Sequence, residues 1–333
     1  MDTRNILFVD DREGIYQTYE DVLLDGHQGW DVSFTNNSTQ ALKMLQQKPY
    51  DLVICDVQMR GSGGLQFFRE ISRLSPSTNR IAITDKSGEK DILNSLNVVH
   101  GYMLKPVNSG QLRESVVQSF AVSDTFNSKA VRDMAANLQH VPSLPALYDQ
   151  LLEVLHSDEV SMQEIGQVIS SDIGMTAKVL KLVNSSFFGL RREILTAEEA
   201  VVYLGVEAVK AMVLSVHAFS ALSVAGMPEE YINELWNHSV TVAAFARCIA
   251  RFENSDKRVV DSAFTAGMLH DAGKLILMDN LPAQYREYLE ALHHDDNSAL
   301  AVECLIFGAT HQEVGAFLLR NWGLPDSIVE PIL

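Results

Sequence analysis

Short continuous apolar runs recur along the first 105 residues, and each run stops at a polar side chain. The runs cover residues 6–9, 52–55, 81–83 and 101–104. Segments of helical periodicity separate them, and this alternation predicts buried parallel strands in a β/α fold. Ligand sites in such sheets lie beyond the carboxyl ends of the strands, so the polar residues after the runs are predicted to meet at one edge.

The polar residues at these strand ends have matched chemistry: Asp10, Asp11, Asp56, Thr84 and Lys105. Clustered carboxylates repel one another and favour a hard cation, most simply Mg²⁺. With the metal neutralising charge, a carboxylate can attack a phosphoryl group and form an acyl phosphate. A Lys ammonium and a Thr hydroxyl would then hold the phosphoryl oxygens. The set predicts a phosphate-accepting aspartate with its metal and its charge partners.

Residues 1–121 resemble the receiver domain of two-component response regulators in this set and in Asp56-Val57-Gln58-Met59 followed by Gly64. The resemblance implies a doubly wound, flavodoxin-like α/β domain with a five-stranded parallel sheet. It implies Asp56 as the phosphoacceptor. It implies that Mg²⁺ is bound directly by Asp11 and Asp56, through water by Asp10, and by the backbone carbonyl of Gln58. It also implies that Thr84 and Lys105, which precedes Pro106, contact the phosphoryl group. The aromatic ring of Tyr102 is implied to act as a switch.

Two residues depart from the pattern of that family. Arg60 stands where a proline is usual after Met59, and Asp85 stands where a small residue is usual after Thr84. An acidic side chain beside a dianionic phosphoryl group is unfavourable unless it points away, because like charges at short range repel. We therefore expect slow or altered phosphorylation kinetics with the site itself retained.

The second part of the chain is predicted to be helical throughout. A polar stretch at residues 123–128 follows the expected last receiver helix near residues 112–120, and prolines at 142 and 145 end the connection. Residues 122–140 are thus predicted to form a linker or connecting helix. Apolar stripes at helical spacing then predict a compact all-α domain over residues 141–333, with Val201 and Val202 among the core positions.

Several phrases in this part resemble the HDOD domain, a helical relative of the HD metal-dependent phosphohydrolases. They begin at Asp172-Ile173-Gly174-Met175-Thr176 and Asn184-Ser185-Ser186-Phe187-Phe188-Gly189, and continue with Trp236-Asn237-His238-Ser239, Gly267-Met268-Leu269-His270-Asp271-Ala272-Gly273-Lys274 and the segment Phe307 to Gly315. Asp172 and Asn184 also suit helix caps.

His270-Asp271 together with His238 resembles the start of an HD metal site, whose ligands would suit Zn²⁺, Mn²⁺ or Fe²⁺. Lys274, one turn beyond His270, could help to hold a phosphate. The later aspartate of the phosphohydrolases and the Gly-Tyr-Pro signature of the HD-GYP branch are missing from the sequence. We therefore favour a buried hydrogen-bond network over a bound metal.

Other polar residues of this part are predicted to be structural. His311 is expected at the start of a helix and aligns with a recurrent HDOD histidine. Residues 293–296, with sequence His-His-Asp-Asp, are predicted to form a solvated loop, and Asp326 is predicted to cap the last helix. The sequence stops at Leu333 inside an apolar helical phrase where family members usually continue, which leaves open a longer natural chain.

Composition narrows the function classes. Of the net charge of −17, residues 1–121 contribute −3 and the rest −14, which argues against binding to nucleic acid or anionic membrane. No apolar run approaches the roughly 20 residues that span a bilayer, so a soluble, cytoplasmic protein is expected. Cys55, Cys248 and Cys304 lack paired spacing and are expected to be buried thiols.

Three functions are therefore compared. The first is a phosphorelay adaptor: a sensor histidine kinase or phosphotransfer protein phosphorylates Asp56, and a non-catalytic HDOD domain passes the signal on by protein contacts. The second is a phosphorylation-regulated metal phosphohydrolase acting on a cyclic nucleotide. The third is a degenerate receiver that docks diguanylate-signalling enzymes. We favour the first; a cyclic-di-GMP-related enzyme is one candidate for the downstream partner, and a homodimer is a further candidate assembly.

Overall fold

A computed structural model gives the fold of the chain. The chain forms two compact units, one of residues 1–127 and one that contains most of the remainder. The structure describes residues 3–24, 29–59, 63–85, 95, 98–125, 141–157, 160–185, 190, 192–214, 227–294 and 298–333.

The first unit is built on a five-stranded sheet with the order β2-β1-β3-β4-β5, in which every neighbouring pair is parallel. The strands are β1 (Arg4–Val9), β2 (Trp30–Thr35), β3 (Leu52–Asp56), β4 (Asn79–Thr84) and β5 (Gly101–Leu104). Side chains on the first three apolar runs are buried, as are Tyr102 and Met103 of the fourth, as expected for strands covered on both faces. The predicted doubly wound sheet is confirmed.

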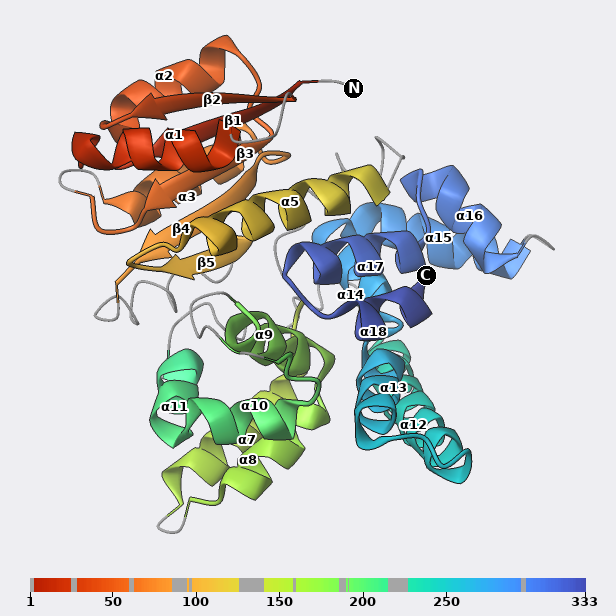
Figure 1. The fold of residues 1–333 in the computed structure, drawn as a ribbon. Coiled ribbons are helices and arrows are strands. Elements are labelled where there is room, and N and C mark those ends of the chain that lie inside the picture. The colour runs from red at the N-terminus through yellow and green to blue at the C-terminus, as the bar shows by residue number, and fades with distance from the viewer. Residues whose placement is uncertain are drawn as a thin grey trace. The chain divides into compact units, whose positions relative to one another are not determined.

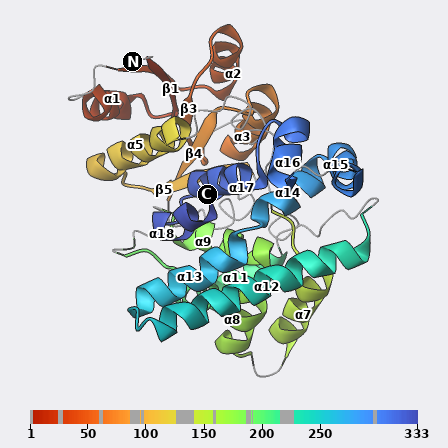
Figure 2. The same cartoon turned by 90° about the vertical axis from the view of Figure 1, so that its right-hand side faces the viewer.

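Helices cover both faces of this sheet (Figures 1 and 2). A short 3₁₀ turn, η1 (Glu13–Ile15), leads into α1 (Tyr16–Leu24), which together with α5 (Ser109–Thr125) packs on the face that carries Ile6, Phe8 and Ile54. The opposite face is covered by α2 (Ser38–Gln47) and α3 (Gly64–Leu74), through residues such as Ala41, Leu45, Phe67 and Phe68.

The end of α5 differs from the sequence prediction. The helix continues through residues 121–125, so the first part of the polar stretch expected to leave the helix belongs to it. Residues 126–140, which contain the rest of the predicted connection, lie outside the described residues.

The second unit is helical in all of its described residues apart from turns and short connections. Its elements are α7 (Pro145–His156), α8 (Met162–Ser170), α9 (Ile173–Val183), α10 (Ala197–Leu204), α11 (Val206–Leu214), α12 (Glu229–Phe252), α13 (Lys257–Leu269), α14 (Ala272–Asn280), α15 (Pro282–His294), α16 (Ala299–Phe307), α17 (His311–Asn321), α18 (Asp326–Val329) and η2 (Glu330–Ile332). Figure 2 shows α12 and α13 side by side as a helical hairpin.

Side-chain caps explain where several of these helices begin. Asp172 precedes α9, and its carboxylate accepts hydrogen bonds from the backbone N–H of Met175 at 2.7 Å and of Leu144 at 2.8 Å. Thr310 and Glu313 form a capping box that starts α17 at His311, as predicted for that histidine. Asn184 stands at the C-cap of α9.

Three sequence predictions in this unit are wrong. Asp326 makes no capping hydrogen bond and instead accepts one from Arg320 Nε at 3.0 Å, since Pro325 occupies the N-cap position. His293 and His294 close α15 and so belong to a helix, while residues 295 and 296 lie outside the described residues. Val202 is 65% exposed because it points away from the buried face of α10.

Helices α14 and α17 touch backbone to backbone at glycines. A Cβ atom on Gly273 would stand 1.8 Å from the carbonyl oxygen of His311, and one on Gly315 would stand 3.0 Å from the backbone nitrogen of Gly273. The two helices therefore approach more closely than any side chain at these positions would allow. This approach brings the first turn of α17 next to the first turn of α14.

Candidate functional sites

The carboxyl edge of the sheet gathers the predicted phosphoacceptor and its neighbours. Asp56 is the last residue of β3 and is 2% exposed. Its Oδ1 accepts a hydrogen bond from the backbone N–H of Gln58 at 2.9 Å, and its Oδ2 forms an ion pair with Nζ of Lys105, which follows β5. The carboxylate is thus held in one orientation by two donors from different parts of the chain.

Asp10 is equally fixed beside it. The residue follows β1 and is fully buried, and its carbonyl oxygen accepts a hydrogen bond from the hydroxyl of Tyr16 at 2.5 Å. Asp10, Asp11 and Asp56 each offer one carboxylate oxygen to a group whose members lie within 4.8 Å of one another. The three aspartates that the sequence singled out are therefore brought together at the sheet edge.

A cation from the chain itself reaches this cluster. Arg12 donates from Nε to Asp10 Oδ1 at 3.0 Å and from a terminal nitrogen to Asp10 Oδ2 at 2.8 Å. The same terminal nitrogen lies 3.9 Å from Asp56 Oδ2. The hydrogen bond to Asp10 raises the pKa of the Arg12 guanidinium above its usual range.

Thr84 is the last residue of the neighbouring strand β4, and Asp85 follows it. Thr84 is fully buried and its hydroxyl donates to the carbonyl oxygen of Asp85 at 3.3 Å. The Asp85 carboxylate accepts a hydrogen bond from the Gln58 side-chain amide at 2.9 Å. This contact gives the acidic group next to the site a defined partner. Arg60, the other departure from the family pattern, lies outside the described residues.

Tyr102, the predicted switch residue, lies on β5 and is 2% exposed. Its hydroxyl lies 3.1 Å from the hydroxyl of Ser95, and burial raises the pKa of the phenol. Lys105 is joined to Pro106 by a cis peptide bond. The structure thus places Tyr102 in the interior with a polar partner, and its switching remains a prediction.

The donor set at this edge fits a hard divalent cation. Carboxylate oxygens are the ligands that Mg²⁺ prefers, and three of them converge where two of the carboxylates are buried. Gly64 stands directly after the loop that carries Gln58, and a Cβ there would lie 2.5 Å from the carbonyl oxygen of Asp56. The loop can therefore fold tightly against the end of β3 only with glycine at this position.

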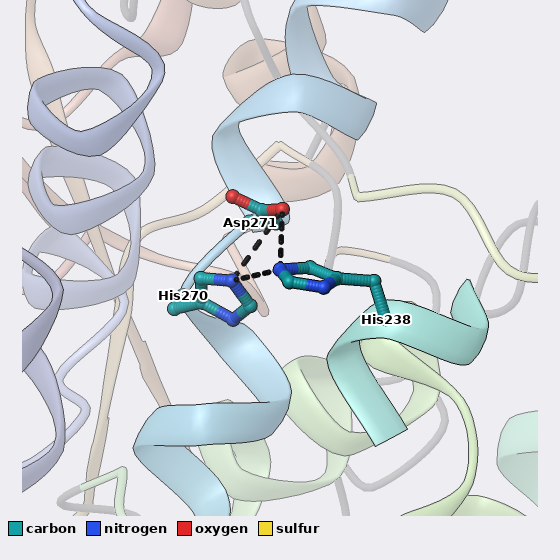
Figure 3. Close-up of side chains that lie close together, drawn as sticks. All are labelled: His238, His270 and Asp271. Atoms are coloured by element: carbon teal, nitrogen blue, oxygen red, sulfur yellow. Dashed lines mark hydrogen bonds and ion pairs between the residues drawn. The ribbon is translucent and has the colours of Figure 1, made fainter. Parts of the chain in front are cut away.

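The helical unit contains a second cluster of titratable groups (Figure 3). His238 on α12 points towards His270 and Asp271 between α13 and α14, with 3.2 Å between the two Nε2 atoms. The distances to Asp271 Oδ2 are 3.8 Å from His238 Nε2 and 3.4 Å from His270 Nε2. These three residues also form a group of possible metal ligands.

The chain supplies Asp271 with two further partners. Lys274 Nζ donates to Oδ2 at 2.9 Å, and His311 Nε2 lies 3.2 Å from Oδ1. Burial alone would raise the pKa of Asp271, but the hydrogen bond from His311 and the charge of Lys274 lower it below its usual range. Both carboxylate oxygens therefore already have a partner from the protein.

Behind His311 lies a carboxylate that the sequence analysis did not select. Glu303 on α16 is 1% exposed and lies 2.8 Å from His311 Nδ1. Burial opposes a charged imidazole, yet the hydrogen bonds to Asp271 and Glu303 raise the pKa of His311. Burial instead lowers the pKa of His270. The cluster thus favours a charged His311 between two carboxylates and a neutral His270.

Arg12 and Glu303 were missed for different reasons. Arg12 directly follows the aspartate pair, and its nearness in sequence could have drawn attention to it. Glu303 is the only charged residue between Ala299 and Phe307, and a lone acid in an apolar helix signals a buried partner.

The prediction that all three cysteines are buried is wrong for two of them. Cys55 is buried, but Cys248 and Cys304 are exposed because they lie on outward helix faces.

Comparisons with known proteins match both units. A family model for the response regulator receiver domain matches residues 6–117, and one for the HDOD domain matches residues 141–333. The crystal structure of the MmoQ response regulator from Methylococcus capsulatus (str. Bath) superposes with a TM-score of 0.50 at 25% identity, covering 58% of this chain and 75% of that one.

Two curated relatives are matched over part of their length. An uncharacterized protein from Treponema pallidum (strain Nichols) is 24% identical over 208 residues, or 62% of this chain and 40% of that protein. The transcriptional regulatory protein ZraR of Escherichia coli (strain K12) is 27% identical over 154 residues, or 46% of this chain and 34% of that protein. The chain thus spans less than half of either relative.

Among its described helices, none is both long and apolar enough to cross a bilayer.

Proposed function

The chain belongs to the HDOD-domain family and carries a response regulator receiver domain ahead of the HDOD domain, so it is a phosphorelay response regulator, and we propose how its residues perform this role. Asp56 accepts the phosphoryl group: a carboxylate oxygen attacks phosphorus, an O–P bond forms, and the bond from phosphorus to the donor's leaving group breaks. The observation that carries this assignment is the buried Asp56 carboxylate, oriented by Gln58 N–H and paired with Lys105 inside the aspartate cluster.

We assign the Mg²⁺ that a receiver domain implies to the carboxylates of Asp11 and Asp56, with Asp10 acting through water and the carbonyl of Gln58 completing the protein ligands. When bound, Mg²⁺ would neutralise charge on the phosphoryl oxygens. Lys105 remains beside Asp56 Oδ2 and can pair with the new phosphoryl group, while Thr84 offers a hydroxyl at the same edge. Buried Tyr102 is the proposed element that responds to these new contacts.

For the HDOD domain we propose transmission by protein contacts without catalysis. Asp271, the carboxylate that a metal site would need, already accepts from Lys274 and His311. A metal ion there would have to share this carboxylate with the positive charge of Lys274, which would weaken its binding. We account for the resemblance of His238, His270 and Asp271 to an HD site by a hydrogen-bond network around the buried Asp271 carboxylate, which His238 joins from an exposed position.

The remaining assignments follow from this role. The phosphodonor of a receiver domain is a protein such as a kinase, and we propose a sensor histidine kinase or a phosphotransfer protein acting in the cytoplasm. The receiver domain would comprise residues 1–121 and the HDOD domain residues 141–333, joined by residues 122–140. An acidic HDOD domain favours a protein as the downstream partner over nucleic acid.

Intact-mass spectrometry tests the phosphoacceptor. The full chain is incubated with Mg²⁺ and a small acyl phosphate, and we expect a mass gain of one phosphoryl group that Asp56→Asn abolishes. Asp31→Asn removes a carboxylate that pairs with Lys48 on the surface and should leave the gain unchanged. A gain that survives in Asp56→Asn would contradict the assignment.

A second measurement tests the helical unit. Metal analysis of the purified chain and a phosphodiesterase assay are compared between wild type and His270→Ala. We expect no stoichiometric transition metal and no turnover that depends on His270. Stoichiometric metal together with turnover lost in the variant would overturn the adaptor function.

A further inference from the structure

Arg12 occupies an unusual position for a surface arginine. Its side chain is 47% exposed, yet its guanidinium engages both oxygens of Asp10, whose side chain is fully buried. The backbone N–H of Arg12 also donates to Asp10 Oδ1 at 3.0 Å. Three donors of one residue are therefore directed at one carboxylate. Two-point contacts of this kind are stronger and more specific than a single ion pair.

The contact also concerns the other aspartates. Arg12 lies 3.9 Å from Asp56 Oδ2, the oxygen that pairs with Lys105. Asp10 and Asp56 belong to the group whose ligand atoms lie within 4.8 Å of one another. Among the described residues, the Arg12 guanidinium thus joins Lys105 as a positive group beside the aspartates. A divalent cation would reduce the same repulsion between these carboxylates. Two cations at one carboxylate repel each other, so binding of either weakens binding of the other.

Packing of the loop alone does not require this arrangement. Asp10 is already held by its backbone N–H, which donates to Thr35 O at 3.2 Å, and by the hydroxyl of Tyr16 on its carbonyl oxygen. The side chain of Arg12 adds nothing to these backbone contacts. Its two side-chain hydrogen bonds act only on the carboxylate that faces the cluster.

We propose that Arg12 is a positioning residue that competes with Mg²⁺ for Asp10 and thereby sets the Mg²⁺ concentration at which the receiver can accept a phosphoryl group. The inference rests on the Mg²⁺ site of the proposed function. Mg²⁺ binding must displace the guanidinium from Asp10 or share the carboxylate with it. The receiver of this chain therefore binds Mg²⁺ more weakly than its three carboxylates alone would.

Isothermal titration calorimetry of Mg²⁺ into the 333-residue chain tests the competition. Because hydrogen bonds between charged groups contribute on the order of a tenfold change in an equilibrium constant, Arg12→Ala should lower the Kd for Mg²⁺ by about tenfold. Arg12→Lys keeps the charge but loses the two-point contact, and its Kd should fall between the two. Arg73→Ala removes the same charge from an exposed position on α3 and should leave the Kd unchanged.

The outcomes separate this inference from the site on which it rests. Asp11→Asn should abolish the binding heat if Mg²⁺ binds at the aspartate cluster. An Arg12→Ala chain whose Kd equals or exceeds that of the wild type, with the heat still dependent on Asp11, would overturn the competition alone. An equal gain in Arg73→Ala would overturn it as well, by showing a general charge effect. Binding heat that persists in Asp11→Asn would refute both the cation site and the competition.

Discussion

His311 and Glu303 are joined inside the helical unit: Nδ1 of the imidazole lies 2.8 Å from each carboxylate oxygen of Glu303. The backbone N–H of His311 donates to the same carboxylate, also at 2.8 Å. Only 10% of the histidine side chain and 1% of the glutamate side chain are exposed. With Asp271 on the other ring nitrogen, the imidazole lies between two buried carboxylates.

The stability of the helical unit should therefore depend on the charge of His311. The pKa of His311 is raised in the folded chain, so its contribution is fully present below the unfolded pKa of about 6.5 and is lost as the pH rises through the folded pKa. His311→Asn should lower the free energy of unfolding by ~3–5 kcal/mol at pH 6, and by less at pH 9. Urea denaturation at pH values from 6 to 9 measures this difference in the free energy of unfolding.

The control for this prediction is His238→Asn, which removes an imidazole of the same cluster whose side chain is 55% exposed. This variant should lower the free energy of unfolding by less than about 1 kcal/mol, the usual contribution of an exposed ion pair. A loss in His311→Asn that is the same at pH 6 and pH 9 would show that the histidine stabilises the unit by packing alone.

Gly273→Ala should separate α14 from α17. Its Cβ would stand 1.8 Å from the carbonyl oxygen of His311, and backbone on both sides must move to relieve the overlap. Overpacking of this kind costs at least ~2 kcal/mol, more than the roughly 1 kcal/mol that alanine gains over glycine in a helix. The midpoint of thermal unfolding, followed by circular dichroism, should therefore fall.

A matched glycine substitution checks the cause. Gly110 is the second residue of α5, and the nearest atom to its added Cβ is the Asn108 side-chain oxygen at 3.2 Å. Gly110→Ala should leave the unfolding midpoint nearly unchanged, because that side chain can shift. If both variants unfold at the wild-type temperature, the close approach of α14 and α17 does not exist in solution.

Because of Lys178, the free energy of unfolding of the chain should rise with pH in the alkaline range. The residue is buried on α9, and burial lowers its pKa from 10.5 to about 8, against the opposing charges of Asp172 and Asp279. Between about pH 8 and 10.5 the folded chain therefore binds fewer protons than the unfolded chain, and the free energy of unfolding rises with pH. The rise is ~3 kcal/mol for a shift of this size.

Comparison with Lys178→Met isolates this effect. The difference in free energy of unfolding between wild type and Lys178→Met should move in favour of the wild type as the pH rises from 8 to 10.5. Lys210→Met, at a partly exposed lysine that pairs with Glu207, should show no such trend. A constant wild-type minus Lys178→Met difference would mean that Lys178 keeps an ordinary pKa in the folded chain.

Gln58 should protect the phosphoacceptor from Asp85. Its side-chain amide donates to the Asp85 carboxylate at 2.9 Å, so removing the amide removes one contact that holds this acidic group in place next to the site. Because like charges near the developing phosphoryl group raise its energy, Gln58→Ala should slow phosphorylation severalfold. The rate of mass gain with a small acyl phosphate measures this.

The same substitution in an Asp85→Ala background provides the control. With the carboxylate removed, Gln58→Ala should no longer slow the reaction, since the two residues act through one contact. Equal slowing in both backgrounds would indicate that Gln58 acts on Asp56 directly, through the loop that carries it.

Strand ends and apolar runs allowed much of the fold and of the phosphoacceptor region to be predicted. Asp10, Asp56 and Thr84 lie where they were expected because the carboxyl ends of parallel strands share one edge. β2 was not picked out, because its alternating residues Trp30-Asp31-Val32-Ser33-Phe34-Thr35 form an edge strand that is only partly buried. Edge strands lack the continuous apolar run of central strands.

Side-chain partners were harder to predict than strand ends. Whether Asp85 points towards Asp56 or towards Gln58 depends on rotamers and neighbours that no sequence spacing specifies. Likewise, Glu303 reaches His311 from another helix, and only the packing of α16 against the start of α17 makes the pair. Helix caps could be predicted from the local sequence where a side chain reaches the helix start. The prediction was wrong for Asp326, because Pro325 occupies the N-cap position.

The contact between Gly273 and Gly315 has a mechanical consequence. Asp271 directly precedes α14, which carries Lys274, and α17 carries His311; the two helices are in backbone contact beside these residues. Neither helix can slide past the other without breaking the Asp271–His311 ion pair. We therefore expect a signal that reaches this part of the domain to move α14 and α17 together.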